Sequence, residues 1–341
     1  MSQTMKSWQY TPAGKGIEAG LRLNDSAPLP PRPKAGRNIL VKVQRASIQP
    51  ADYKLLELPG YARFLGTPIT PATGFAGTVT ESNVSDFSAG DLVVGCLKIY
   101  PKHGALSEYI AVSDNDILAK IDAKQPSDVD DFAGIDASAI TAVYDLRGLQ
   151  AGNKVFINGG SGGTGTFGVQ IAKSIGLSVG TTCSTRNVAL VSQLGADVVL
   201  DYTKCNLVQE LQRHVKESGA PFDRAIQNVE AGAWDLYRQS HTFLGKSAAF
   251  LHVGMGTSLA GQMDMAKVLA WPGLLGGGKR KLEMPMTPLE QGLLDEAVGL
   301  VREKKVRVVV DERFGMDGVV EAFAKSKTGR AVGKIIVKVA E

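Results

Sequence analysis

The chain has 341 residues, of which 44% are hydrophobic and 21% charged, the balance of a soluble globular protein with one large or two medium domains. Its net charge of +4 is small and scattered, so it does not indicate nucleic-acid binding, although it is compatible with a phosphorylated ligand. The three cysteines form no C-x-x-C pair, which excludes a disulfide framework and a four-cysteine zinc site. Lone thiols fit a reducing compartment.

The N-terminal segment lacks the apolar core of a secretion signal and the Arg-rich pattern of a transit peptide. No run approaches the roughly twenty apolar residues that cross a membrane. We therefore expect a cytoplasmic protein that binds neither membranes nor nucleic acid.

Residues 1 to about 125 have the pattern of a turn-rich β domain. Runs with β-branched residues predict strands at Ile39–Val43, Gly77–Glu81, Leu92–Cys96 and Glu108–Val112. The proline-rich segment Ala27–Lys34 predicts a surface loop, because proline lacks the N–H that helices and central strands use.

From about Ser127 short apolar strands alternate with amphipathic helices. The predicted strands are Lys154–Ile157, Leu177–Cys183, Val198–Asp201, Phe222–Ile226 and Ala248–Val253. The predicted helices are Thr166–Ile175, Asn187–Leu194, Leu207–Ser218 and Ala233–Thr242. This alternation predicts an α/β fold with a doubly wound parallel sheet of the Rossmann type, whose ligand lies at the carboxyl ends of the strands.

The last part of the chain is predicted to contain both helices and strands. The predicted ones are the helices Pro288–Lys304 and Asp317–Ser326 and the strands Arg307–Asp311 and Lys334–Val339. Before them, the apolar segment Leu269–Leu275 contains Trp271 and leads into glycines and cations. This segment could form a wall for a hydrophobic substrate or the edge of a dimer.

The segment Asn158–Gly168 (NGGSGGTGTFG) carries the strongest functional signal. Two overlapping matches to G-x-G-x-x-G are Gly160, Gly162, Gly165 and Gly163, Gly165, Gly168. Between a strand and a helix, such glycines permit a tight turn, close approach of a diphosphate and close helix–strand packing. The helix N-terminus would face the phosphates. The residues expected to bind a dinucleotide are Gly160, Ser161, Gly162, Gly163, Thr164 and Gly165.

The residues after the second strand indicate which dinucleotide binds. NAD-binding relatives of this fold place a carboxylate about twenty residues after the fingerprint, but this chain has Ser184 and Arg186 there. A guanidinium binds a 2′-phosphate, which a carboxylate would repel. We therefore predict NADPH as the cofactor, with Ser184 and Arg186 at its 2′-phosphate. Tyr202 could reach the phosphate or adenine, or could simply cover a strand end. Asn228 and Val253, near the ends of the fourth and fifth strands, are also expected to contact the cofactor.

Further segments resemble the medium-chain dehydrogenase/reductase superfamily, in its zinc-independent quinone oxidoreductase and enoyl reductase branch. The matching segments are Ile39–Lys54, Thr70–Val79, Gly90–Gly95, Gly104–Val112 and Thr328–Val339. Gly276–Lys281 is similar to a segment of the subgroup named zinc-type alcohol dehydrogenase-like. The resemblance implies a GroES-like β domain from residues 1–125, a Rossmann NADPH-binding domain from 126–285 and a return of 286–341 to the catalytic domain. It also implies an active site in the cleft and a homodimer.

The implied activity is hydride transfer from NADPH to the C=C bond of an α,β-unsaturated carbonyl, or to a quinone, with a small hydrophobic substrate. The resemblance places Lys54 where a cation could hydrogen-bond the carbonyl oxygen or donate a proton. Tyr53 is a second possible donor, or it could pack against the cleft wall. Thr141 resembles the threonine beside the nicotinamide, and Lys334 matches a Gly-Lys segment near the cofactor.

We expect no metal, because Gln49 or its neighbours stand where zinc-dependent relatives have their cysteine, and Gly74-Phe75-Ala76 stands where they have a glycine followed by His-Glu. Gln49 also replaces a family Asn, Gly74 replaces a family Asp, and Gln227 ends a strand that usually ends in Asp-x-Val-Gly. The missing carboxylate at Gly74 is expected to reduce local polarity. These departures bear on which substrate the protein takes more than on which cofactor it binds. The alternatives are a carbonyl reductase or alcohol dehydrogenase, and an NADPH-binding protein without redox turnover.

Overall fold

The computed structural model describes residues 4–98, 102–122, 129–230, 232–254, 256 and 259–340. The chain divides into two compact units. The first comprises Met1–Ile140 and Pro288–Glu341, and the second comprises Thr141–Thr287. In the described part of the chain, every helix is too short or too polar to cross a membrane.

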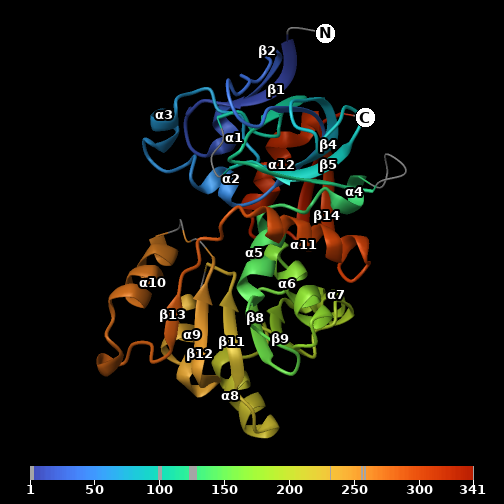
Figure 1. The fold of residues 1–341 in the computed structure, drawn as a ribbon. Coiled ribbons are helices and arrows are strands. Elements are labelled where there is room, and N and C mark those ends of the chain that lie inside the picture. Colours follow the sequence, from blue (N-terminus) through green and yellow to red (C-terminus); the bar gives the residue numbers. More distant parts are fainter. Residues whose placement is uncertain are drawn as a thin grey trace. The chain divides into compact units, whose positions relative to one another are not determined.

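The second unit is built on six parallel strands in the order β10-β9-β8-β11-β12-β13, and Figure 1 shows β13, β12, β11, β8 and β9 side by side. The strands are β8 Lys154–Asn158, β9 Ser178–Cys183, β10 Val198–Asp201, β11 Phe222–Gln227, β12 Leu244–His252 and β13 Lys281–Glu283. The chain runs outward from β8 to β10 and then returns to β11 on the other side of β8. This reversal creates a switch point between β8 and β11, where doubly wound sheets bind their ligands.

Helices connect these strands, as parallel pairing requires. The connecting helices are α6 Gly163–Ser174, α7 Val188–Gln193, α8 Leu207–Ser218, α9 Ala233–Arg238 and α10 Leu259–Ala270, with the 3-10 turns η2 Thr185–Asn187, η3 Ser240–Thr242 and η4 Gly273–Leu275, and α5 Ala137–Leu146 precedes β8. Phe156 of β8 and Phe250 of β12 share a buried core with Val208 of α8 and Leu236 of α9. Helix α6 packs on β8 and β9.

The first unit contains a seven-stranded sheet in the order β14-β15-β3-β4-β5-β7, in which β6 also pairs with β3. Its strands are β3 Ile39–Ile48, β4 Gly74–Ser82, β5 Leu92–Cys96, β6 Tyr109–Val112, β7 Ile117–Lys120, β14 Val310–Gly315 and β15 Lys334–Lys338, and a separate pair is formed by β1 Thr4–Tyr10 and β2 Leu21–Pro28. Its helices are α1 Ile17–Gly20, α2 Ala51–Lys54, α3 Tyr61–Leu65, α4 Val129–Phe132, α11 Gln291–Arg302 and α12 Val319–Lys327, with the turn η5 Met316–Gly318. Pairing of β15 with β3 brings the end of the chain into this sheet.

These two sheets confirm the predicted fold class, a Rossmann sheet with a GroES-like β domain. The strand predicted at Arg307–Asp311 was partly wrong, because β14 begins at Val310 and continues to Gly315. Helix α10 was not predicted, because glycines surround its start: Gly254 and Gly256 precede it and Gly261 lies in its first turn. Strand β13 has three residues, which is too short for a visible alternation.

A buried carboxyl group of the second unit has no hydrogen-bonding partner in the part of the chain that the structure describes. Asp145 of α5 is 1% exposed, and neither of its carboxyl oxygens has a partner among the described residues. Burial raises its pKa to about 7, although the charge of Arg224 acts in the opposite direction. The Arg224 guanidinium instead donates to the backbone oxygens of Asp145 and Arg147.

Candidate functional site

The glycine turn lies between β8 and α6, and its fingerprint glycines differ in how much space a side chain would have. A Cβ on Gly160 would lie 2.1 Å from Thr181 Oγ1, and one on Gly165 would lie 2.1 Å from Gly159 O, so both positions require glycine. A Cβ on Gly162 would meet nothing closer than Gly159 O at 3.6 Å. The packing of the chain itself therefore leaves open space at Gly162, the position where the fold brings its backbone to a diphosphate.

Helix α6 begins at Gly163, with Gly162 as its N-cap. No side chain caps this end, and the first N–H groups of a helix have no partner within the helix. Of the two overlapping matches, Gly160, Gly162 and Gly165 therefore have the strand–turn–helix placement. With the open space at Gly162, this end of α6 fits the phosphates of a dinucleotide.

A chain of polar side chains crosses the carboxyl ends of β9, β8 and β11. Thr182 Oγ1 accepts from Gly159 N at 2.8 Å and donates to Asn158 Oδ1 at 2.5 Å. The amide of Asn158 donates to Gln227 Oε1 at 2.7 Å, and Gln227 Nε2 donates to Val229 O at 2.7 Å. Gln227, which replaces the family aspartate, thus ties the turn to the segment after β11 without any charge.

The residues after β9 form η2, in which Ser184 is the N-cap. Ser184 is half-buried and Arg186 is exposed, so both can reach a ligand at this edge. Asn187 Nδ2 donates to Ser161 Oγ at 3.0 Å, which joins η2 to the glycine turn. Tyr202, after β10, is 55% exposed.

A carboxylate that the sequence interpretation missed lies beside this segment. Asp201 ends β10 and pairs in register with Cys183, the last residue of β9. It accepts from Thr185 Oγ1 at 2.5 Å and from Thr203 Oγ1 at 2.6 Å. These hydrogen bonds lower the pKa of Asp201 to about 2. Both of its oxygens are engaged within the protein.

Two buried polar atoms lie unpaired at the ends of β11 and β12. Asn228 Oδ1 and His252 Nδ1 have no hydrogen-bonding partner among the described residues. Burial lowers the pKa of His252. Val253, next along the chain, donates its N–H to Gln227 O at 3.0 Å. Orphaned polar atoms beside the switch point fit a polar ligand that would supply their partners.

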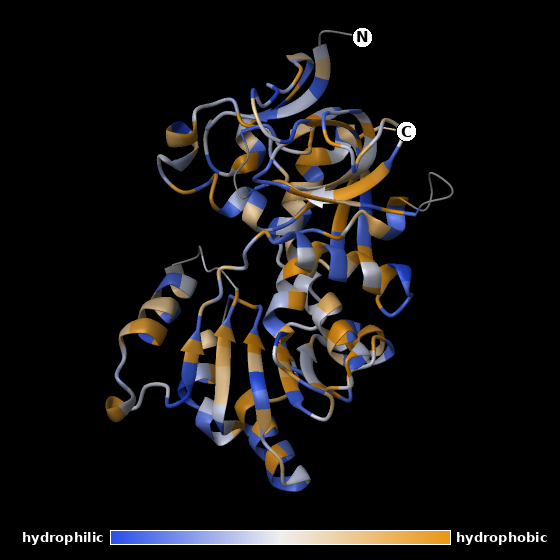
Figure 2. Cartoon of the chain, viewed as in Figure 1, coloured by the Kyte–Doolittle hydropathy of each residue, from blue (hydrophilic) through white to orange (hydrophobic). Residues whose placement is uncertain are grey.

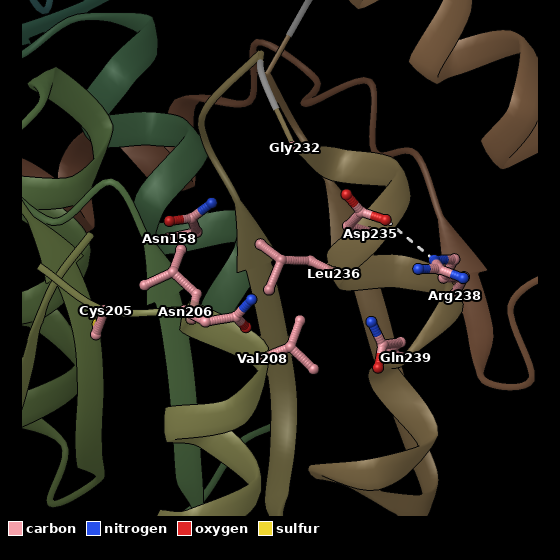
Figure 3. A pocket seen from close by; sticks show the side chains of 10 residues that line it. Asn158, Cys205, Asn206, Val208, Gly232, Asp235, Leu236, Arg238 and Gln239 are labelled. Carbon is pink, nitrogen blue, oxygen red and sulfur yellow. Dashed lines mark hydrogen bonds and ion pairs between the residues drawn. The ribbon is translucent and has the colours of Figure 1, made fainter. Parts of the chain in front are cut away.

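A pocket of about 380 Å³ lies among segments that follow the carboxyl ends of β8, β10 and β11 (Figure 3). Asn158 is the one expected turn residue in its wall. Figure 3 shows the apolar Leu236 and Val208 together with the amides of Asn206 and Gln239, while Asp235 pairs with Arg238 at 3.0 Å. The pocket thus belongs to the same sheet edge as the glycine turn.

In the first unit, the expected proton donors lie in α2. Lys54 is half-buried, whereas Tyr53 is 7% exposed and belongs to the hydrophobic core. The Lys327 ammonium lies 5.9 Å from the centre of the Tyr53 ring. This placement favours Lys54 as the proton donor, because the Tyr53 side chain is packed in the hydrophobic core. Burial raises the pKa of Asp52 to about 7, and its carboxylate accepts from Gln49 N at 2.9 Å.

Lys334 lies in the first unit and is 2% exposed. Its ammonium group donates to Asp136 Oδ2 at 2.7 Å and to Ser138 Oγ at 3.0 Å. Its expected contact with the cofactor stays a prediction. Thr141 is half-buried and follows in α5.

The expected loss of polarity at Gly74 is wrong, because the Asp136 carboxylate fills that space. Asp136 Oδ2 would lie 3.1 Å from a Cβ at residue 74. The sequence interpretation missed Asp136. Its local signal is that of a helix N-cap, since its Oδ1 accepts from Ser138 N at the start of α5.

The structure thus gathers the expected cofactor residues at one edge of the second unit, except Lys334. Lys54, Tyr53 and Lys334 belong to the first unit. Within the described ranges, no group of three or more His, Cys, Asp or Glu residues could hold a metal ion.

The apolar segment Leu269–Leu275 is largely on the surface. Leu269 is 61% exposed, Trp271 is 52% exposed and Leu274 is fully exposed. Figure 2 shows this apolar colouring on α10 and η4. Exposed apolar patches of this kind mark interaction sites, and both interpretations, a substrate wall or a dimer edge, stay predictions.

Fold and turn together define a dinucleotide-binding oxidoreductase of the two-domain type. Two family descriptions match, alcohol dehydrogenase GroES-like domain over residues 35–123 and zinc-binding dehydrogenase over residues 194–337. The trans-enoyl reductase pgmF of Aspergillus terreus is 41% identical, over 99% of this chain and 97% of its own. The chloroplastic quinone-oxidoreductase QR1 of Triphysaria versicolor is 30% identical, with 98% of both chains covered.

The solved quinone oxidoreductase from Coxiella burnetii is 26% identical, with a TM-score of 0.78 over 98% of this chain and 99% of its own. The chain belongs to the medium-chain dehydrogenase/reductase family, in the branch of trans-enoyl reductases and quinone oxidoreductases. It is therefore an oxidoreductase of a family that binds a nicotinamide cofactor.

Proposed function

We propose that the protein is an NADPH-dependent, metal-independent reductase that transfers hydride to the C=C bond of an α,β-unsaturated carbonyl, or to a quinone. The observation that carries the choice of cofactor is the pair Ser184 and Arg186 after β9, where an NAD site would have a carboxylate. The nearby Asp201 does not oppose this choice, since Thr185 and Thr203 hold both of its oxygens. The names of the relatives support the two classes of acceptor.

The residues of the second unit would hold the cofactor and orient its ring. Backbone N–H groups at the start of α6 bind the diphosphate, and Arg186 binds the 2′-phosphate. The bound NADPH supplies the hydride. Asn228 and Val253 contact the cofactor at the ends of β11 and β12.

The residues of the first unit would act on the acceptor. Lys54 hydrogen-bonds the carbonyl oxygen, stabilises the negative charge that develops there and donates the proton. From the second unit, the Thr141 hydroxyl of α5 holds the carboxamide or the acceptor oxygen. We also infer a cytoplasmic homodimer, and sedimentation of the purified protein tests the dimer.

The proposed activity is tested with purified protein, NADPH and two acceptors, 3-penten-2-one and menadione, in the presence and absence of EDTA. Loss of NADPH absorbance that EDTA leaves unchanged is the expected result. Product analysis distinguishes the saturated ketone from the allylic alcohol that a carbonyl reductase would form. Tight NADPH binding without reduction of any acceptor would overturn the proposal in favour of a binding protein.

Arg186→Ala should lower the preference for NADPH over NADH. Loss of a charge-assisted hydrogen bond costs about 1.5–3 kcal/mol, so the ratio of the two affinities should fall by about tenfold or more. Titration of both cofactors by fluorescence measures this ratio. Arg213→Ala is the matched control, because Arg213 is an exposed arginine paired with Glu210 on α8 and does not line the pocket. An unchanged ratio in Arg186→Ala would show that Arg186 does not bind the 2′-phosphate.

Gly162→Ala should weaken NADPH binding and leave the fold intact. Gly162 has φ −81 and ψ 179, which alanine adopts without strain, and among the described residues its added Cβ meets no atom closer than Gly159 O at 3.6 Å. The methyl group would instead stand between the diphosphate and the start of α6. Displaced charge-assisted hydrogen bonds of about 1.5–3 kcal/mol raise the Kd by roughly 10- to 150-fold.

Calorimetric titration measures the Kd of the Gly162→Ala variant, and thermal unfolding measures its stability. Gly165→Ala is the contrasting variant, because its Cβ would collide with the Gly159 carbonyl oxygen at 2.1 Å. It should lose about 1–3 kcal/mol of stability. Equal losses of stability in the two variants would contradict the separate roles assigned to these glycines.

A further inference from the structure

A buried carboxylate lies at the start of β4. Gly74 has no room for a side chain, because a Cβ there would lie 2.2 Å from Ser47 Oγ and 2.5 Å from Asp136 Cβ. Asp136 reaches this place from the segment before α5 and is fully buried. A carboxylate attached at residue 74 and one attached at residue 136 would therefore occupy the same space.

The Asp136 carboxylate is fully paired. Its Oδ2 accepts from Lys334 Nζ at 2.7 Å and from Ser47 Oγ at 2.5 Å, and its Oδ1 accepts from Ser138 N at 2.9 Å. The side chains of Lys334 and Asp136 are 2% and 0% exposed. Burying two charges is costly, and apolar replacements of similar shape are often as stable. Stability alone therefore does not explain this pair.

A line of hydrogen bonds runs from the pair to the start of α2. Lys334 Nζ donates to Ser138 Oγ at 3.0 Å, and Ser138 Oγ donates to Gln49 Oε1 at 3.4 Å. The other end of the Gln49 amide donates to Thr73 Oγ1 at 2.8 Å. The Gln49 backbone N–H donates to Asp52 Oδ2 at 2.9 Å, which closes the turn that begins α2. The line ends at the helix that carries Lys54.

We propose that Asp136 is a positioning residue: its carboxylate fixes Lys334 and Ser138, which orient Gln49 and thereby the turn that presents Lys54. The inference rests on the proposed role of Lys54 in the reduction. The rigidity of the turn is nevertheless a property of the first unit that can be measured without any substrate.

The deciding variant is Asp136→Asn combined with Lys334→Met. It removes both buried charges together and so leaves no charge unpaired, while the methionine cannot donate to Ser138. The readout is hydrogen exchange by mass spectrometry over residues 49–55, where Asp52 N and Lys54 N donate within the turn. Loss of one hydrogen bond should speed exchange there by about tenfold, with no change over β5.

Two further variants make the result specific. Ser47→Ala removes another hydrogen bond to Asp136 but leaves the Lys334–Ser138 link, so exchange over residues 49–55 should stay within about twofold of the parent. Gly74→Asp combined with Asp136→Gly and Ser47→Ala attaches the carboxylate to β4 and removes both atoms that a Cβ at residue 74 would meet, Ser47 Oγ at 2.2 Å and Asp136 Cβ at 2.5 Å. This exchange of positions should restore the parent rate to within about threefold.

Parental exchange over residues 49–55 in the double variant Asp136→Asn, Lys334→Met would overturn the proposal. Faster exchange over both this turn and β5 would also overturn it, because it would assign the pair to general stability. In turnover with 3-penten-2-one or menadione, the double variant should show a kcat about tenfold lower, with the KM for the acceptor unchanged. If the parent reduces neither acceptor, the proposed function fails, and the exchange rates still decide the role of Asp136.

Discussion

Asp145→Asn should flatten the pH dependence of stability in the acid-to-neutral range. The folded protein holds the Asp145 proton up to a pKa of about 7, because the carboxyl group is buried, whereas the unfolded chain releases it near 3.8. The folded state thus binds more protons, so the stability that this group contributes is complete below pH 3.8 and is lost as the pH rises to about 7. At about 1.4 kcal/mol per pKa unit, the loss amounts to about 4 kcal/mol.

Urea unfolding at several pH values between about 5 and 8 measures this effect. The free energy of unfolding of the wild-type protein should fall across this pH interval. It should fall less steeply in Asp145→Asn, because that variant releases one proton fewer on unfolding. Some slope should remain, since burial also raises the pKa of Asp52 to about 7. Asp86→Asn changes an exposed aspartate and should keep the full wild-type slope. Parallel curves for wild type and Asp145→Asn would show that Asp145 is not buried as a neutral acid.

Lys54→Met should lower kcat by about 100-fold or more, because a positioned proton donor contributes roughly that factor. Methionine keeps the length of the side chain and removes the ammonium group. The Kd for NADPH should not change, since the glycine turn and η2 belong to the second unit. Steady-state kinetics with 3-penten-2-one and menadione measure kcat.

The matched control is Lys15→Met, which removes an exposed lysine of the first unit. It should leave kcat at the wild-type value. A wild-type kcat in Lys54→Met would show that Lys54 is not the proton donor. Thr141 would then be the next residue to substitute. A parallel rise in the Kd for NADPH would indicate that Lys54 supports the cofactor instead of the acceptor.

The parts of the fold that follow from local sequence could be predicted. The turn at Asn158–Gly168 was found because glycine spacing between a strand and a helix reports local geometry. Helix α8 has the predicted bounds, because its apolar residues recur at the helical period and Asn206 caps its start through Gln209 N.

The parts of the fold and of the site that depend on distant contacts could not be predicted from the sequence. The ion pair of Asp136 and Lys334 joins residues 198 positions apart, and no local pattern reports it. A glycine at residue 74, taken alone, predicts a loss of local polarity. That prediction fails because the Asp136 carboxylate fills the space. Asp201 was overlooked beside Arg186 because it lies 16 positions after Thr185 in the chain, and only the pairing of β10 with β9 brings the two side chains together.

The polar chain across the strand ends has a direction. Every donor from Gly159 through Thr182, Asn158 and Gln227 points the same way and ends at the Val229 carbonyl. A change at one member would leave its neighbour with a donor facing a donor, or an acceptor facing an acceptor. Among related sequences, substitutions at Thr182, Asn158 and Gln227 should therefore occur together, and the family's aspartate at position 227 should be accompanied by different residues at the other two.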